Sequence, residues 1–200
     1  MPANNAGVAR NANAVLAALH SRVSVGEVTD PAPSAAQREA IFKAALRAPD
    51  HGLLRPWRFL CVEGEARKHL GQILADVEES VLDEPLTPTQ RGKIIARPLR
   101  APLLVLVVAK VQAHSKVPEL EQLLSTAAAV QNMLIAAHAL GVGAMWRTGL
   151  STYTPLLAKK LELASDERLL GFLYMGTPRA QQKSAPELNV AEFFCVWPRA

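Results

Sequence analysis

Aromatic side chains are scarce in this chain of 200 residues, with Phe, Trp and Tyr together making up 5%. Apolar residues still account for 50% of the chain, which is enough to bury a sizeable core in one domain of this length. Much of that core must therefore come from small side chains packed closely on helices. The composition favours a helix-rich α/β or α+β domain.

Cysteine is also rare, and the two present, Cys61 and Cys195, are too few for a disulfide framework. No group of Cys and His residues has the spacing of a zinc site, so we expect no metal centre. Cys61 lies in the apolar run 57–62, which predicts a small buried side chain.

No hydrophobic run approaches the roughly eighteen residues that a membrane-spanning helix needs. The first apolar stretch, residues 14–19, is too short for the core of a signal peptide. We expect a cytoplasmic protein with no membrane partner. Residues 1–11 are predicted to be frayed, and residues 12–200 to form a single domain with a C-terminal extension from about residue 177.

Basic residues are in modest excess, giving a net charge of +4. They are scattered along the chain without aromatic residues between them, which is unlike the pattern of a nucleic-acid-binding protein. We therefore expect no nucleic-acid partner, and the positive charge suits an anionic cofactor equally well.

Several common catalytic motifs are absent as well. The chain has no Gly-x-Ser-x-Gly, no phosphate-binding Gly-Lys-Ser/Thr loop and no His-Glu-x-x-His, and four of its histidines are dispersed. These absences argue against a serine hydrolase, a P-loop enzyme and a zinc protease.

Hydrophobic periodicity predicts alternating helices and strands. Ser34 is a good N-cap for the second helix, and Gly141 stands where a glycine commonly ends a helix. The run 103–108 is apolar without alternation, so we expect a central strand buried on both faces. The helix at 119–140 is apolar almost all round in its second half, which predicts burial on all sides. The predicted helices are 13–20, 34–47, 65–81, 89–96, 119–140 and 152–161, and the predicted strands are 57–63, 103–108, 143–147 and 168–175.

Two short segments carry groups that could bind a phosphate and a flat ring. Arg22 and Ser24 offer a guanidinium fork and a hydroxyl that match the oxygens of a phosphate, although an exposed Arg and a turn Ser would look the same. Further on, the glycines of 141–143 allow backbone to approach a ligand, and Trp146-Arg147-Thr148 adds a ring, a cation and a hydroxyl. This Gly-x-Gly follows a helix and enters a strand, so it is not the Rossmann fingerprint.

A third segment, 48–57, lies between them, and in this order the three resemble the FMN-dependent nitroreductase family, most closely its small YdjA-type branch of NAD(P)H nitroreductases. The resemblance runs from about residue 14 to residue 177. The family pattern Ala-Pro-Ser-x-x-Asn-x-Gln-Pro-Trp is kept at its two ends, but Leu53 and Arg55 stand where Asn and Gln are usual. Val23 stands where a second basic residue or a His is common.

The resemblance implies an α+β nitroreductase fold, with a central mixed β-sheet flanked by helices and a homodimer that exchanges its C-terminal tails. It implies one FMN at each of two inter-subunit sites. The apolar tail residues Phe193, Phe194, Val196 and Trp197, and the wide apolar face of helix 119–140, also need a partner surface. We therefore expect helix 119–140 at the two-fold interface and a tail that crosses from about Glu187 to extend the partner's sheet. The implied cofactor-binding residues are Arg22, Val23, Ser24, Arg47, His51, Trp146, Arg147 and Thr148, and those on the nicotinamide side are Ala136, Ala137, His138, Ala139, Leu140 and Gly141.

The implied activity is a ping-pong transfer of two electrons from NADH or NADPH, through FMN, to a small-molecule acceptor such as a nitroaromatic or a quinone. The flavin supplies the chemistry, so no side chain is named as catalytic. Without the resemblance, Arg47 could equally be a helix C-terminal cation and His51 a loop donor. Two alternatives stay open: a flavin-binding storage or redox-sensing module with little turnover, and a basic helical nucleic-acid binder.

Overall fold

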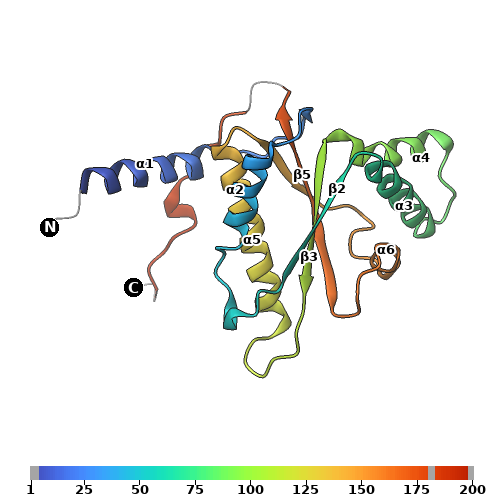
Figure 1. The fold of residues 1–200 in the computed structure, drawn as a ribbon. Coiled ribbons are helices and arrows are strands. Elements are labelled where there is room, and N and C mark those ends of the chain that lie inside the picture. Colours follow the sequence, from blue (N-terminus) through green and yellow to red (C-terminus); the bar gives the residue numbers. More distant parts are fainter. Residues whose placement is uncertain (1–4, 180–182, 198–200) are drawn as a thin grey trace.

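The computed structural model describes residues 5–179 and 183–197, and the chain forms helices on both faces of one sheet (Figure 1). Its elements are α1 (Asn5–Ser21), β1 (Val28–Thr29), α2 (Ala35–Ala45), η1 (His51–Leu53), β2 (Trp57–Glu63), α3 (Ala66–Ser80), α4 (Pro88–Ile95), η2 (Arg97–Arg100), β3 (Leu103–Lys110), α5 (Glu119–Ala139), β4 (Gly143–Arg147), α6 (Pro155–Lys160), β5 (Glu167–Pro178) and η3 (Val190–Glu192).

The sheet is antiparallel at every strand pairing among the described residues, which corrects the predicted mixed sheet. Its strand order is β1-β5-β3-β2, and β4 pairs with β5. The connection through α3 and α4 leaves β2 at Glu63 and enters β3 at Leu103, which is the register partner of Glu63. The chain thus returns to the sheet at the end where it left, and this connection makes the pairing antiparallel.

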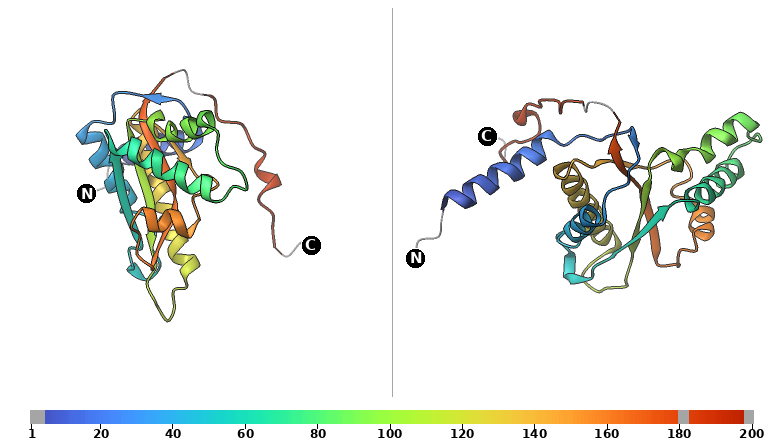
Figure 2. Two further views of the ribbon diagram at one scale, coloured as in Figure 1. Left: turned by 90° about the vertical axis from the view of Figure 1, so that its right-hand side faces the viewer. Right: turned by 45° about the horizontal axis from the view of Figure 1, so that its top comes forward.

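The central strand β3 is buried on both faces, as its unbroken apolar run predicts. Leu103, Val105 and Val107 pack with α2 and α5 on one side of the sheet. The alternate residues of the same strand pack with α3 and α6 on the other side. Figure 2 shows the two helical layers with the sheet between them.

Local sequence signals set most element boundaries. The side chain of Ser34 accepts from the Gln37 N–H at 3.3 Å, and the Gln37 side chain accepts from the Ser34 N–H at 2.9 Å, forming a capping box at the start of α2. Gly141 has a φ of 71° directly after α5. Both predicted caps are confirmed.

Three local predictions need correction. Helix α1 begins at Asn5, inside the segment predicted to fray, while residues 1–4 lie outside the described part. Cys61 is exposed, because β2 is an edge strand and has a neighbouring strand along one side, leaving the other side open. The second half of α5 is not buried on all sides, because Gln131 and Ala139 are exposed. In the first half, Leu120 and Leu124 are 64% and 54% exposed, which leaves an apolar surface such as an interface would need.

The C-terminal tail lies beside α1 rather than on the sheet. A groove of about 890 Å³ separates residues 183–190 from Ala17, His20 and Ser21 of α1. The tail's apolar side chains remain in solvent, with Phe194 76% and Trp197 90% exposed. Among the described residues, no helix is long and apolar enough to cross a membrane.

Candidate functional site

The structure brings two of the three sequence segments together at the outer edge of β4. The Val25 N–H donates to the Ala144 carbonyl at 3.0 Å, and Arg147 Nη2 donates to the Gly26 carbonyl at 3.2 Å. Strand β4 pairs with β5 on its other side, which leaves this edge free for the segment that follows α1. The segment 22–26 and the end of β4 therefore form one surface, which we call the β4 edge.

Two arginine side chains at the β4 edge carry buried nitrogen atoms with no hydrogen-bond partner among the described residues. They are Arg22 Nη1 and Arg147 Nε. An unpaired buried donor costs about 1–3 kcal/mol, and more when the group is charged, so structures rarely leave one without a reason. An anionic ligand accepts hydrogen bonds from guanidinium groups, and each of these residues therefore fits one.

Gly143 serves packing at this edge rather than ligand approach. A Cβ at Gly143 would lie 2.7 Å from Val28 Cγ1 and 3.1 Å from Val25 Cγ1. The glycine is needed so that the segment after α1 can lie against β4.

A cavity of about 410 Å³ opens beside the end of β4, and we call it the β4-end cavity. Arg147, Thr148 and the loop that follows them line one side, and Phe172 and Tyr174 of β5 line another. The Arg147 guanidinium lies over the Tyr174 ring, with Cζ 5.5 Å from the ring centroid. Two of the predicted cofactor residues, Arg147 and Thr148, therefore line one open cavity.

Positive charge predominates in the β4-end cavity. Arg97 and Arg100 of η2 line it together with Arg147, and Glu78 is the one carboxylate among the described residues of its lining. The Glu78 side chain is 9% exposed and is paired with Arg97. Burial raises the pKa of the Tyr174 phenol, while the charges of the three arginines act in the opposite direction. Such a cavity favours an occupant that carries or develops negative charge.

Sequence reasoning missed the contribution of η2. Its residues Arg97 and Arg100 are three apart, and in a 3₁₀-helix side chains at this spacing point the same way. The spacing was visible in the sequence, but it carries this meaning only once the segment is known to be 3₁₀ and to end beside the sheet.

Trp146 points to the opposite face of the sheet from Arg147. It packs with the core between the sheet, α2 and α5, and its Nε1 donates to the Leu170 carbonyl at 3.1 Å. Gly171, with a φ of 128°, makes room for this contact, because a Cβ there would lie 2.7 Å from Trp146 Nε1. The indole N–H of Trp146 is thus already satisfied inside the chain.

The end of α5 borders the same region as the β4 edge. Ser21 Oγ and His138 Nε2 are 2.8 Å apart, which joins the end of α1 to the end of α5. Within the predicted nicotinamide side, Ala137 is buried, Ala136 and His138 are half-buried, and residues 139–141 are exposed. Val23 is half-buried and Ser24 is exposed beside them.

Arg47 and His51 lie elsewhere. Both are exposed, and His51 Nδ1 is 3.1 Å from Ser125 Oγ, near the start of α5. About 20 Å of helix rise separates Ser125 from His138 at the other end of α5. Within one chain, therefore, His51 lies far from the end of α5 that borders the β4 edge, and Arg47 follows Ala44, whose carbonyl accepts from Asn132 Nδ2 in the second half of α5.

Comparison with known proteins decides the family. The model of the nitroreductase family matches residues 19–177. The chain belongs to the nitroreductase family. It is 36% identical over 174 residues to "Putative NAD(P)H nitroreductase YdjA" of Escherichia coli K12, covering 87% of this chain and 92% of that protein.

Solved structures of nitroreductases share the fold. A nitroreductase-like protein from Bacillus cereus superimposes with a TM-score of 0.78 at 24% identity, covering 92% of this chain and 96% of that one. A Desulfovibrio desulfuricans protein, described as "a putative nitroreductase in complex with FMN", gives a TM-score of 0.69 at 30% identity, covering 93% and 98%. The predicted nitroreductase membership and α+β fold are confirmed. No cluster of His, Cys, Asp and Glu suited to a metal ion occurs in the described parts of the chain.

Proposed function

We propose that this protein is an FMN-dependent NAD(P)H oxidoreductase that binds the flavin between the β4 edge and the β4-end cavity. The observation that carries the proposal is the pair of buried arginine nitrogens at the β4 edge, Arg22 Nη1 and Arg147 Nε, which have no hydrogen-bond partner among the described residues. A relative at 30% identity has been solved with FMN, and FMN supplies both an anionic phosphate and a ring that becomes anionic on reduction.

The phosphate is assigned to Arg22 and Ser24, since the guanidinium and the hydroxyl can both donate to its oxygens. Arg147 and Thr148 are assigned to the flavin where the β4-end cavity opens. Arg97 and Arg100 add positive charge there, which stabilises a reduced, anionic ring. Val23 is assigned to the flavin through its backbone groups. Trp146 supports β4 from the opposite face of the sheet.

The partner subunit is proposed to complete each site. His51 contacts Ser125, about 20 Å of helix rise from His138, and Arg47 stands four residues before His51, so we propose that a second copy supplies both to the β4 edge. Exposed Leu120 and Leu124 on α5 and Leu46 after α2 give this side of the molecule an apolar surface for that contact. A homodimer with its two-fold axis near α5 would bury them.

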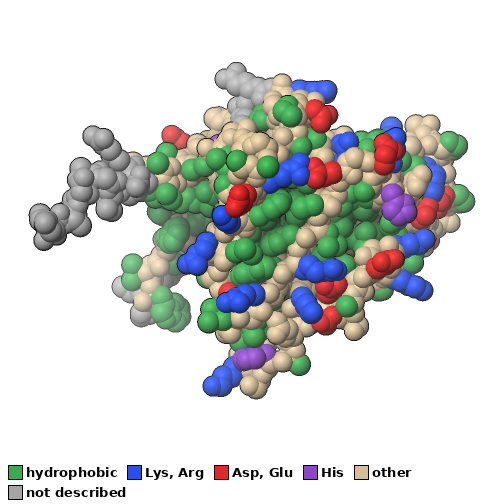
Figure 3. All heavy atoms as spheres, in the orientation of Figure 1, with side chains coloured by type: hydrophobic (Ala, Val, Ile, Leu, Met, Phe, Trp, Pro, Cys, Tyr) green, Lys and Arg blue, Asp and Glu red, His purple; other side chains and the backbone are tan. Residues whose placement is uncertain are grey.

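The tail is proposed to cross to the partner. Its exposed apolar residues include Phe193 and Val196, at 66% and 83%, and such surface is costly to leave in water. Within the described part of the chain, edge strand β2 pairs only with β3. Hydrophobic side chains gather across the middle of the face that β2 crosses (Figure 3). The partner's tail could add to this edge.

Bound FMN would supply the redox chemistry, accepting a hydride from NADH or NADPH and passing two electrons to a nitroaromatic, a quinone or a similar acceptor in a ping-pong sequence. The residues of this chain would bind and orient the flavin and stabilise negative charge on it, and none is assigned as an acid or a base. The nicotinamide is assigned to residues 136–141, at and just after the end of α5, of which 139–141 are exposed. The cytoplasmic location stays a prediction.

A flavin-binding storage or redox-sensing module is the alternative. It is favoured by the loop at 50–55, where Leu53 and Arg55 have φ values of 55° and 49° and Asp50 Oδ2 accepts from the Arg55 N–H at 2.7 Å. Here a carboxylate and the backbone build the loop, in place of the amide side chains usual in the family.

Flavin titration of two variants tests the assignment of the phosphate. Arg22→Ala removes a charge-assisted contact worth about 1.5–3 kcal/mol, so the Kd for FMN should rise at least about tenfold. Lys93→Ala removes an exposed cation from α4 and is the matched control. Quenching of flavin fluorescence gives both constants, and equal values for the two variants would overturn the assignment.

A further inference from the structure

A second cavity, of about 370 Å³, lies where β1, the first turn of α3 and the end of η2 meet. Three arginines from three separate segments line it: Arg67, Arg100 and Arg179. Glu27 and Asp30 line it as well. Within the described residues, no ion pair joins either carboxylate to any of the arginines. We call this cavity the β1 pocket.

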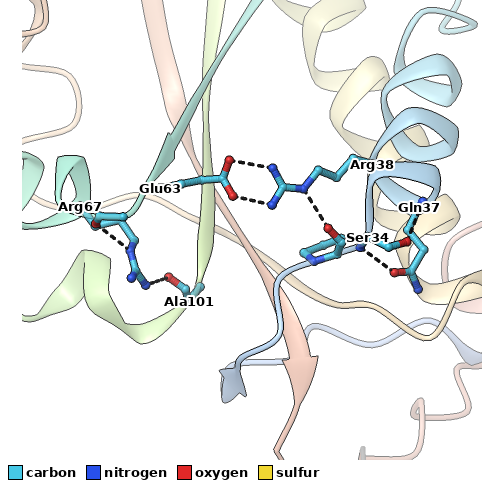
Figure 4. Close-up of polar contacts among 8 residues, drawn as sticks. Ser34, Gln37, Arg38, Glu63, Arg67 and Ala101 are labelled. Carbon is cyan, nitrogen blue, oxygen red and sulfur yellow. Dashed lines mark hydrogen bonds and ion pairs between the residues drawn. The ribbon is translucent and has the colours of Figure 1, made fainter.

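The walls of the β1 pocket are held in place by hydrogen bonds. Arg67 Nε donates to the Gly64 carbonyl at 3.2 Å and its Nη1 to the Ala101 carbonyl at 2.8 Å (Figure 4). These contacts fix the guanidinium plane and leave Nη2 without a hydrogen bond to a described residue. Across the pocket, the Arg179 N–H donates to the Glu27 carbonyl at 3.1 Å, continuing the pairing of β1 with β5.

The chemistry of this lining matches a sugar phosphate better than a bare anion. Guanidinium groups donate in a fork that fits phosphate oxygens. Carboxylates repel a free phosphate, but they accept hydrogen bonds from sugar hydroxyls. Leu99 and Pro102 add an apolar wall, against which a base could lie. Phosphate, hydroxyls and an apolar ring together describe a nucleotide.

The β1 pocket adjoins the β4-end cavity. Arg100 lines both spaces, and Arg147 of the β4-end cavity donates to the carbonyl of Gly26, which lines the β1 pocket. We infer that the β1 pocket binds the adenosine-phosphate end of the nicotinamide coenzyme while the flavin occupies the neighbouring cavity. This inference rests on the proposed function for the identity of the nucleotide, but not for the chemistry of the pocket.

Equilibrium titration of FMN-saturated protein with 5′-AMP, adenosine and inorganic phosphate tests the inference. We expect 5′-AMP to bind at least about tenfold more tightly than adenosine or phosphate, since only 5′-AMP engages both the arginines and the carboxylates. Arg179→Gln, on an exposed residue, should weaken 5′-AMP at least about tenfold. Arg168→Gln, at an exposed arginine remote from this pocket, is the matched control and should change nothing.

A second variant gives a result of opposite sign for the two anionic probes. Glu27→Ala removes a hydroxyl acceptor and a repulsive charge, so 5′-AMP should bind more weakly and inorganic phosphate more tightly. Equal binding of 5′-AMP and adenosine, displacement of FMN by 5′-AMP, or an Arg179→Gln variant with unchanged affinity would each overturn the inference. Failure of the proposed function has a different signature, in which 5′-AMP binds as expected but no flavin is retained.

Discussion

A mixed dimer tests whether each flavin site takes Arg22 from one chain and Arg47 from the other. In one chain Arg22 follows Ser21, which contacts His138 at the end of α5, whereas Arg47 lies between Ala44, which contacts Asn132, and His51, which contacts Ser125. Either Arg→Ala change removes a charge-assisted contact of about 1.5–3 kcal/mol, roughly tenfold or more in FMN affinity. Co-expression of an Arg22→Ala chain with an Arg47→Ala chain, under two different affinity tags, gives the mixed dimer for purification.

The shared-site arrangement places both changes in one of the two sites and leaves the other site intact. The two costs add to about 3–6 kcal/mol in the damaged site, if they are independent. The FMN titration should then have two phases, with half of the sites at wild-type affinity. A mixed dimer of Arg22→Ala with Lys43→Ala is the control, because Lys43 is an exposed cation one turn before Arg47. Equal weakening of all sites in the Arg22/Arg47 mixed dimer, relative to this control, would refute the shared site.

Three further predictions concern packing, assembly and pH. Gly143→Val should destabilise the fold by about 1–3 kcal/mol in a denaturant titration, because the new side chain would meet Val28 and Val25. Gly92→Ala, on an open helix surface, is the control and should be neutral or stabilising. Equal unfolding free energies for the two variants would contradict the packing role of Gly143. Truncation before Glu187 should lower dimer stability and FMN affinity together, and a truncated dimer with full FMN occupancy in sedimentation would exclude the crossing tail. Burial raises the folded-state pKa of Tyr174, so the contribution of this group to stability is present below about pH 10 and is lost as the pH rises through the raised pKa. Tyr174→Phe should therefore flatten the decline in unfolding free energy above about pH 10. An unchanged decline in the variant would count against a raised pKa of Tyr174.

The sequence predicted those elements whose signals are local. Strands β2 and β4 begin and end where the pattern and the flanking glycine and proline place them. The unbroken apolar run of β3 correctly indicated a central strand. Ser34 and Gly141 correctly marked helix ends, since caps depend on neighbouring backbone groups.

Features that depend on tertiary arrangement could not be predicted in this way. Whether Trp146 or Arg147 faces the β4-end cavity depends on which side of the sheet α5 covers, and alternation alone does not show this. Cys61 is exposed because β2 is an edge strand, a fact of sheet order. Arg97 and Arg100 join the site only through the position of η2 beside β5.

Anaerobic reduction of the purified protein tests whether it is an FMN-dependent oxidoreductase. The protein as isolated, or after reconstitution with FMN, is mixed with NADH or NADPH without oxygen, and the flavin absorbance is followed with time. We expect bound FMN that is bleached rapidly and regains its colour when a quinone or a nitroaromatic is added. Bound FMN that keeps its colour with both nucleotides would contradict the oxidoreductase and favour the storage module, and a protein that binds no FMN would contradict both.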